Sequence, residues 1–203
     1  TLVTGRAGTG KTTLAADFAN DYERVAWYSV ASADADWKIF SSYFVESIKN
    51  AGLAGAETTS AAADEVSPFV ENLFARISKD KDGATADKPA LIVLDDVHYI
   101  FDAEWFADFF NSLLYSLGRE THLLLLSRSS PAFPLWRLRS KQVLGVIDEE
   151  LLLFNREEAG EFLSGYSLKG QAADEIFTKS FGRIAKLKSL AEKATEKRVR
   201  WSD

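Results

Sequence analysis

Short apolar runs alternate with amphipathic stretches along the first part of the chain. The runs are rich in leucine, β-branched and aromatic residues, which is typical of strands. We expect strands at residues 1–4, 25–30, 90–94, 123–126 and 143–147. The runs at 90–94 and 123–126 are apolar without alternation, which indicates strands of a parallel sheet that is buried on both faces.

Between these runs, apolar residues recur every three or four positions, which predicts helices. The helices that we expect cover residues 11–20, 36–50, 64–78 and 102–117. Leu14, Ala15 and Phe18 are expected to form the inward face of the first helix, and Asp102 to cap the last one. The small, polar or charged stretches 51–63 and 79–88 are expected to be loops. Because strands and helices alternate, the pattern predicts an α/β fold with a parallel core sheet flanked by helices.

The pattern changes near residue 150. Asn155 can cap a helix and Glu158 follows three residues later, which is a typical helix start. The remaining sequence to Asp203 is helical in character. We therefore expect an α/β domain at residues 1–150 and a small helical subdomain, which need not be complete, at residues 151–203.

The most specific motif lies between the first expected strand and the first expected helix. It fits the pattern G-x-x-x-x-G-K-T in the strand-to-helix context that a P-loop requires. Glycines allow backbone N–H groups to cradle phosphates, and the helix N-terminus adds partial positive charge. Lys11 is expected to reach the β- and γ-phosphates of ATP, and the Thr12 hydroxyl to bind Mg²⁺. The residues expected to bind the nucleotide are Gly5, Arg6, Ala7, Gly8, Thr9, Gly10, Lys11, Thr12 and Thr13.

Polar residues follow two of the expected strands directly. Asp95 ends the run at 90–94, where P-loop proteins carry the acidic residue that holds Mg²⁺, and the adjacent Asp96 is a candidate base for the attacking water. Arg128 follows the run at 123–126, where its guanidinium could pair with the γ-phosphate. The alternatives are that the two aspartates only end a strand and that Arg128 is a surface residue.

The composition excludes several other functions. The net charge of −6 and the pI near 5.1 weigh against a DNA-binding surface, which needs clustered Lys and Arg. The absence of cysteine excludes disulfides and thiolate metal sites. No apolar run has the length of a membrane span, so we expect no membrane partner and a cytoplasmic location. The chain begins just before the glycine-rich loop and contains no methionine, so we expect it to be an internal piece of a longer protein.

Three segments together resemble a known family. They are the loop at residues 5–14, the acidic strand at 91–98 and the Leu-Leu-Ser-Arg stretch at 125–128, and the likeness continues at 134–139 and 151–159. The combination is similar to the nucleotide-binding domain of signal-transduction ATPases with numerous domains, in particular the MalT-like branch of large LuxR-type transcriptional regulators. The resemblance covers about residues 1–165.

The resemblance implies a P-loop NTPase of the additional-strand type, in which a strand lies between the phosphate-loop strand and the acidic strand. It also implies that ATP and ADP, with Mg²⁺, act as switch ligands, that hydrolysis is slow, and that the ATP state favours self-association. DNA would bind only through a helix-turn-helix domain outside this sequence. The family carries a Gly-x-Pro element near the adenine, for which Gly182, Arg183 and Ile184 are the counterpart here, with isoleucine in place of proline.

Other functional classes also contain P-loops. The main alternative is an AAA+ motor ATPase of replication or remodelling, although such motors usually carry Asp-Glu where this chain has Asp95-Asp96. A kinase-like P-loop transferase would need an acceptor pocket and a lid, which the sequence does not identify. A module that binds nucleotide without turnover is the third alternative.

Overall fold

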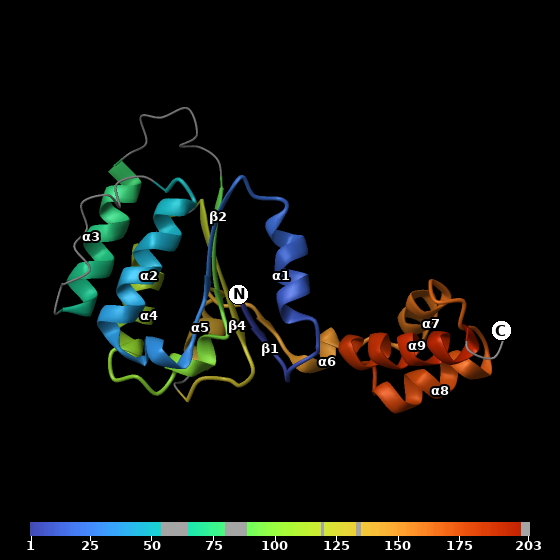
Figure 1. Cartoon of the computed structure of the whole chain (residues 1–203). Coiled ribbons are helices and arrows are strands. Elements are labelled where there is room, and N and C mark those ends of the chain that lie inside the picture. Colours follow the sequence, from blue (N-terminus) through green and yellow to red (C-terminus); the bar gives the residue numbers. More distant parts are fainter. Residues whose placement is uncertain (54–64, 80–88, 119, 133–134, 200–203) are drawn as a thin grey trace. The chain divides into compact units, whose positions relative to one another are not determined.

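The computed structural model describes residues 1–53, 65–79, 89–118, 120–132 and 135–199, and it contains a parallel five-stranded sheet in the order β2-β3-β4-β1-β5 (Figure 1). The strands are β1 (Leu2–Thr4), β2 (Arg24–Ser29), β3 (Ala90–Asp95), β4 (Thr121–Ser127) and β5 (Val146–Ile147). β3 pairs in parallel with β2 on one side and with β4 on the other. Because β4 lies between β3 and β1, the expected additional-strand topology is confirmed. The fifth strand is shorter than the sequence pattern predicts.

Helices cover both faces of this sheet, as the unbroken apolar runs require. α2 (Trp37–Asn50), α3 (Val66–Lys79) and α4 (Phe106–Ser116) lie on one face, and α1 (Lys11–Ala19) lies on the other (Figure 1). All six residues of β3 are buried, as are the last five of β4. Shorter helical segments in the described part of residues 1–146 are η1 (Ser32–Ala35), η3 (Val97–Ile100) and α5 (Trp136–Ser140). The loops expected at 51–63 and 79–88 lie mostly outside the described residues.

Aromatic side chains form the centre of the core between the sheet and α2 to α4. The Phe40 ring lies 4.7 Å from that of Trp105 and 4.9 Å from that of Phe109, centroid to centroid. Such contacts add to the stabilisation that burial of the rings provides. The Trp105 indole N–H donates to the carbonyl of Ala35 at 2.8 Å, so the one polar atom of this side chain is satisfied.

Two local expectations are wrong. Of the three residues expected to face inward from α1, only Ala15 is buried, whereas Leu14 and Phe18 are 42% and 44% exposed. α1 packs through Ala15, so the larger side chains of Leu14 and Phe18 remain partly exposed beside the contact. The helix expected to start at Asp102 begins at Phe106 with Trp105 at its cap position, because η3 and a turn occupy the preceding residues.

The chain divides into two compact units. The first contains Thr1–Val3 and Thr12–Val146, and the second contains Thr4–Lys11 and Ile147–Asp203. The helices of the second unit are α6 (Glu149–Leu152), α7 (Arg156–Ser164), α8 (Gln171–Ser180) and α9 (Ile184–Val199). They share a separate apolar core built from Ala159, Leu163, Leu168, Ala173, Ile176, Leu187 and Ala191. The expected start of α7 is confirmed, since Asn155 and Glu158 form a reciprocal capping box.

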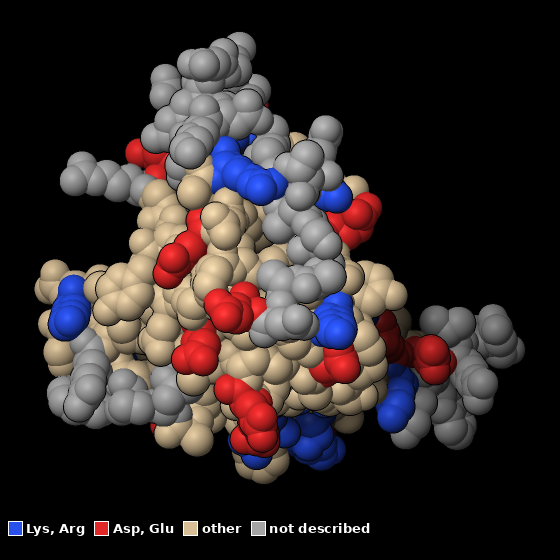
Figure 2. Space-filling model, turned by 90° about the vertical axis from the view of Figure 1, so that its left-hand side faces the viewer, with Lys and Arg blue, Asp and Glu red and all other residues tan. Residues whose placement is uncertain are grey.

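The described surface agrees with the acidic composition. On the face shown in Figure 2, acidic side chains are spread among uncharged ones, and the coloured Lys and Arg side chains do not form a continuous patch. Among the helices described, none combines the length and the apolar character needed to cross a bilayer.

Candidate functional site

The glycine-rich loop connects β1 to α1 and belongs to the second unit. Gly8 and Gly10 have φ values of 81° and 93°, which residues other than glycine rarely adopt. A Cβ atom at Gly8 would lie 2.9 Å from Cβ of Ala185, and one at Gly10 would lie 3.2 Å from Cγ2 of Ile184. Both glycines are therefore required for the backbone conformation and for the close approach of the start of α9.

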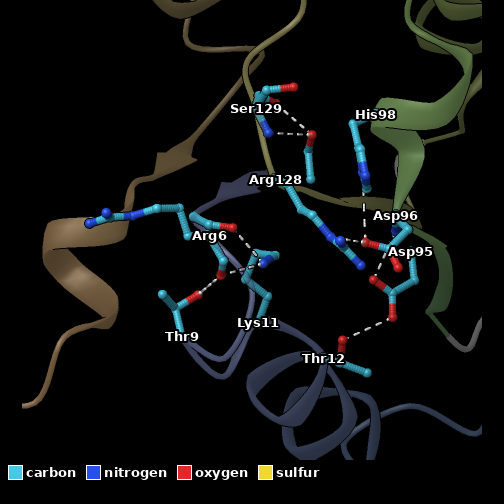
Figure 3. A network of polar contacts seen from close by, with 11 residues as sticks. Arg6, Thr9, Lys11, Thr12, Asp95, Asp96, His98, Arg128 and Ser129 are labelled. Carbon is cyan, nitrogen blue, oxygen red and sulfur yellow. Dashed lines mark hydrogen bonds and ion pairs between the residues drawn. The ribbon is translucent and has the colours of Figure 1, made fainter. Parts of the chain in front are cut away.

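Lys11 is the first residue of α1, and its ammonium group folds back into the loop (Figure 3). Nζ donates to the carbonyl oxygens of Gly5 at 2.6 Å and of Arg6 at 3.1 Å. The residue is only 7% exposed. A positive charge is thus held inside the loop by backbone carbonyl groups.

The remaining loop residues that the sequence assigns to the nucleotide lie as follows. Thr9 is buried, and its hydroxyl donates to the carbonyl of Arg6 at 3.0 Å, which closes the turn. Ala7 and Gly8 are exposed at the tip of the loop, and Thr13 is exposed in the first turn of α1. The structure therefore leaves the loop tip accessible to a ligand.

Within the first unit, Thr12 and Asp95 come together although they are far apart in sequence (Figure 3). The Thr12 hydroxyl donates to Oδ2 of Asp95 at 3.0 Å, and Asp95 is 7% exposed at the end of β3. Adjacent oxygen ligands of an octahedral Mg²⁺, each at about 2.1 Å, are themselves about 3 Å apart. A hydroxyl and a carboxylate at this spacing therefore fit Mg²⁺. The other carboxylate oxygen of Asp95 is oriented by the Asp96 backbone N–H at 2.9 Å.

Asp96 occupies an unusual backbone conformation and contacts two basic side chains. Its φ of 55° lies in the left-handed region, which Asp and Asn tolerate better than most residues and which is enriched at functional sites. Arg128 Nε lies 3.3 Å from Oδ1 of Asp96, and His98 Nδ1 lies 3.6 Å from the same oxygen (Figure 3). The two residues expected to be catalytic are thus paired. His98 was not expected here; its position shortly after Asp95 is the only signal in the sequence.

The loop also has an acidic partner that the sequence does not reveal. Glu149, the first residue of α6, accepts from Arg6 Nε at 2.8 Å and lies 2.6 Å from Arg6 Nη2. Arg183 Nη2 lies 3.6 Å from the same carboxylate. The hydrogen bonds from Arg6 lower the pKa of Glu149 to about 2, so the group is ionised at neutral pH. Arg6, whose side chain is 68% exposed, therefore pairs with a protein carboxylate.

The segment at residues 182–184, which we expect to be the counterpart of the Gly-x-Pro element, lies beside the loop within the second unit. The Ala185 backbone N–H donates to the carbonyl of Gly8 at 3.1 Å. Gly182 has a φ of 73°, and a side chain there would collide with the carbonyl of Phe154. Glycine is thus required at the turn that brings the start of α9 against the phosphate loop.

Comparison with curated proteins finds a relative of the expected kind. The chain is 28% identical over 167 residues to the HTH-type transcriptional regulator MalT of Yersinia pestis (strain Pestoides F). The match covers 80% of this chain and 18% of that regulator. The resemblance to the nucleotide-binding domain of MalT-like regulators is thereby confirmed.

Solved structures share the fold at low sequence identity. The Aeropyrum pernix ORC1 protein, solved in complex with DNA, superposes with a TM-score of 0.55 at 16% identity, over 98% of this chain and 54% of that one. Drosophila ORC bound to DNA gives a TM-score of 0.51 at 20% identity, over 82% of this chain and 41% of that one. The sequence profile described as AAA ATPase domain matches residues 1–127, which include the phosphate loop, Asp95, Asp96 and the end of β4. The chain belongs to the AAA ATPase domain family.

Proposed function

We propose that this chain is the ATP-binding switch module of a MalT-like, LuxR-family transcriptional regulator of the cytoplasm. Residues 1–150 form its ATP-binding domain and residues 151–203 its helical subdomain. ATP binds with Mg²⁺, hydrolysis is slow, and the ATP or ADP state controls activation or self-association. DNA binding belongs to a helix-turn-helix domain outside this sequence.

The likeness to MalT supports the regulator part of this proposal, and the hydrogen bond between Thr12 and Asp95 is the observation that carries the binding of ATP with Mg²⁺. A glycine-rich loop alone also occurs in proteins that bind other anions, whereas a hydroxyl and a buried carboxylate 3.0 Å apart at the start of the loop helix add a site for a hard cation. A bound Mg²⁺ supplies charge neutralisation for the terminal phosphates. Thr12 and Asp95 would hold this ion, and the loop with Lys11 would bind the phosphates.

The Mg²⁺ dependence of ATP binding tests this assignment. In the parent protein we expect removal of Mg²⁺ by a chelator to weaken ATP binding by about tenfold, since one charge-assisted contact contributes about this factor to the affinity. Asp95→Asn should lose most of this dependence, because the amide carries no charge. Isothermal titration with and without Mg²⁺ measures both, with Asp102→Asn, an exposed aspartate of the same segment, as the matched control. An unchanged Mg²⁺ dependence in Asp95→Asn would contradict the metal site.

A second expectation concerns Arg128 as the residue that distinguishes ATP from ADP. Arg128 follows β4, and its guanidinium contacts the carboxylate of Asp96. A γ-phosphate would either replace this carboxylate as the partner of Arg128 or bind the guanidinium together with it. Arg128→Ala should therefore weaken ATP binding by about tenfold or more and ADP binding much less. Dissociation constants for both nucleotides, measured in parent and variant, test this.

Arg139→Ala provides the control for Arg128, because Arg139 is an exposed arginine of α5 outside the proposed site. It should leave both dissociation constants unchanged. Equal losses for ATP and ADP in Arg128→Ala would make Arg128 a general phosphate anchor and remove it from the switch.

A motor ATPase remains the second candidate, because the solved structures that share the fold include ORC proteins bound to DNA. A switch hydrolyses ATP slowly and a motor does so rapidly, at least when its partner domains are present. Steady-state ATPase rates of this chain and of the full-length protein separate the two. Rapid turnover that partner domains stimulate would favour the motor.

A further inference from the structure

One peptide unit of the phosphate loop is held from both sides. The Arg6 backbone N–H donates to Oε2 of Glu149 at 2.9 Å, and the Gly5 carbonyl accepts from Nζ of Lys11 at 2.6 Å. These two groups belong to the same peptide bond. Because the described chain contains no cis peptide, its N–H and C=O point in opposite directions. Glu149 on one side therefore fixes the direction of the carbonyl that holds Lys11 on the other.

Glu149 is itself well anchored. It begins α6, whose cap residue Asp148 accepts from the Leu151 backbone N–H at 3.3 Å. The carboxylate also holds the Arg6 side chain through Nε at 2.8 Å. α6 approaches the loop so closely that a Cβ at Gly5 would lie 3.4 Å from Cβ of Glu149 and 3.3 Å from Cδ1 of Leu152. A charged, fixed acceptor thus faces the Arg6 N–H.

We propose that Glu149 is a positioning residue for Lys11, acting through the Gly5–Arg6 peptide to keep the ammonium group in place for nucleotide phosphates. This inference rests on the proposed function, since it presumes that Lys11 binds phosphate. It assigns a role in nucleotide affinity to a residue 143 positions from Arg6 in sequence. Because Glu149 acts through the loop, its loss weakens ATP and ADP alike, unlike the loss of Arg128.

Four variants separate positioning through the peptide from pairing with the Arg6 side chain. Glu149→Ala removes the acceptor and should weaken both nucleotides by about tenfold. Glu149→Gln retains an oxygen that accepts from the Arg6 N–H, so it should recover most of the affinity. Arg6→Ala removes the guanidinium but leaves the N–H bond to Glu149, so it should have a smaller effect than Glu149→Ala. Glu150→Ala, the exposed neighbour on α6, should have none.

Isothermal titration of ATP and ADP, with thermal unfolding measured in the absence of nucleotide, decides the result. A lower unfolding temperature in Glu149→Ala with unchanged affinities would show a structural role only and overturn the inference. An Arg6→Ala loss as large as that of Glu149→Ala would assign the effect to the side-chain ion pair and also overturn it. If Glu149→Ala does not fold, the nucleotide affinities of Glu149→Gln and Arg6→Ala still test the inference. Arg6→Ala binds more weakly than Glu149→Gln only if the effect comes from the ion pair with the guanidinium, and that result would overturn the inference.

Lys11→Ala, measured in the same series, distinguishes this inference from the proposed function. If Lys11→Ala abolishes binding and Glu149→Ala does not weaken it, the function stands and the positioning role is wrong. If Lys11→Ala binds ATP as the parent does, the proposed phosphate site itself is wrong.

Discussion

Replacement of Lys11 by alanine should weaken binding of ATP by about 100-fold or more, and binding of ADP, which lacks the γ-phosphate, by about tenfold or more. Each charge-assisted contact to a phosphate contributes about 1.5–3 kcal/mol, and every 1.4 kcal/mol is a factor of about ten in affinity. Lys11 is expected to contact two phosphates of ATP, and its ammonium group is already held inside the loop by the carbonyls of Gly5 and Arg6. Isothermal titration of both nucleotides in parent and variant measures the loss.

Lys11 is buried, so its replacement needs a control for folding. Lys11→Met retains the apolar stem and removes only the charge, and it should lose as much affinity as Lys11→Ala. Lys38→Ala, an exposed lysine of α2, should bind like the parent. Folded Lys11 variants, as judged by thermal unfolding, that retain the parent affinity would contradict the phosphate site.

Asp96→Asn should slow ATP hydrolysis by about 10²- to 10⁴-fold, the range for loss of a general base. Among the contacts described, Arg128 and His98 both approach Oδ1, which leaves Oδ2 to accept a proton from water. Asparagine also tolerates the left-handed backbone conformation of this residue, so the substitution changes the charge with little strain. ATP affinity should therefore remain close to that of the parent. Single-turnover hydrolysis of labelled ATP measures the rate even when turnover is slow.

The comparison for Asp96 is Asp102→Asn, which removes one negative charge from the same segment at an exposed position. It should hydrolyse ATP at the parent rate. Equal rates in Asp96→Asn and the parent would remove Asp96 from the reaction. A parent protein that binds ATP but shows no hydrolysis would instead make the chain a binding module without turnover.

The strands of the core sheet and most helices follow from the sequence. β3 and β4 are predicted within two residues at either end because their apolar runs are unbroken and end in polar residues. α2 is predicted because its apolar positions repeat at helical spacing, and the structure adds that Asp36 caps it. α1 shows the limit of such reasoning. Periodicity identifies the residues that share a helix face, but whether another element covers that face depends on the packing, and Leu14 and Phe18 remain exposed.

The sequence by itself predicted the phosphate loop, its lysine and the acidic pair at the end of β3, because each is a local pattern whose residue types and spacing are typical of one chemistry. Only the tertiary structure decided which distant residues join them. It paired Thr12 with Asp95, Arg128 with Asp96, and Arg6 with Glu149 across 143 positions. It also grouped the loop with the segment that begins at Ile147. The physical reason is that many helices begin with a glutamate, so the sequence does not distinguish Glu149 from others. Its proposed positioning role arises only because the fold places it beside the Arg6 backbone N–H group.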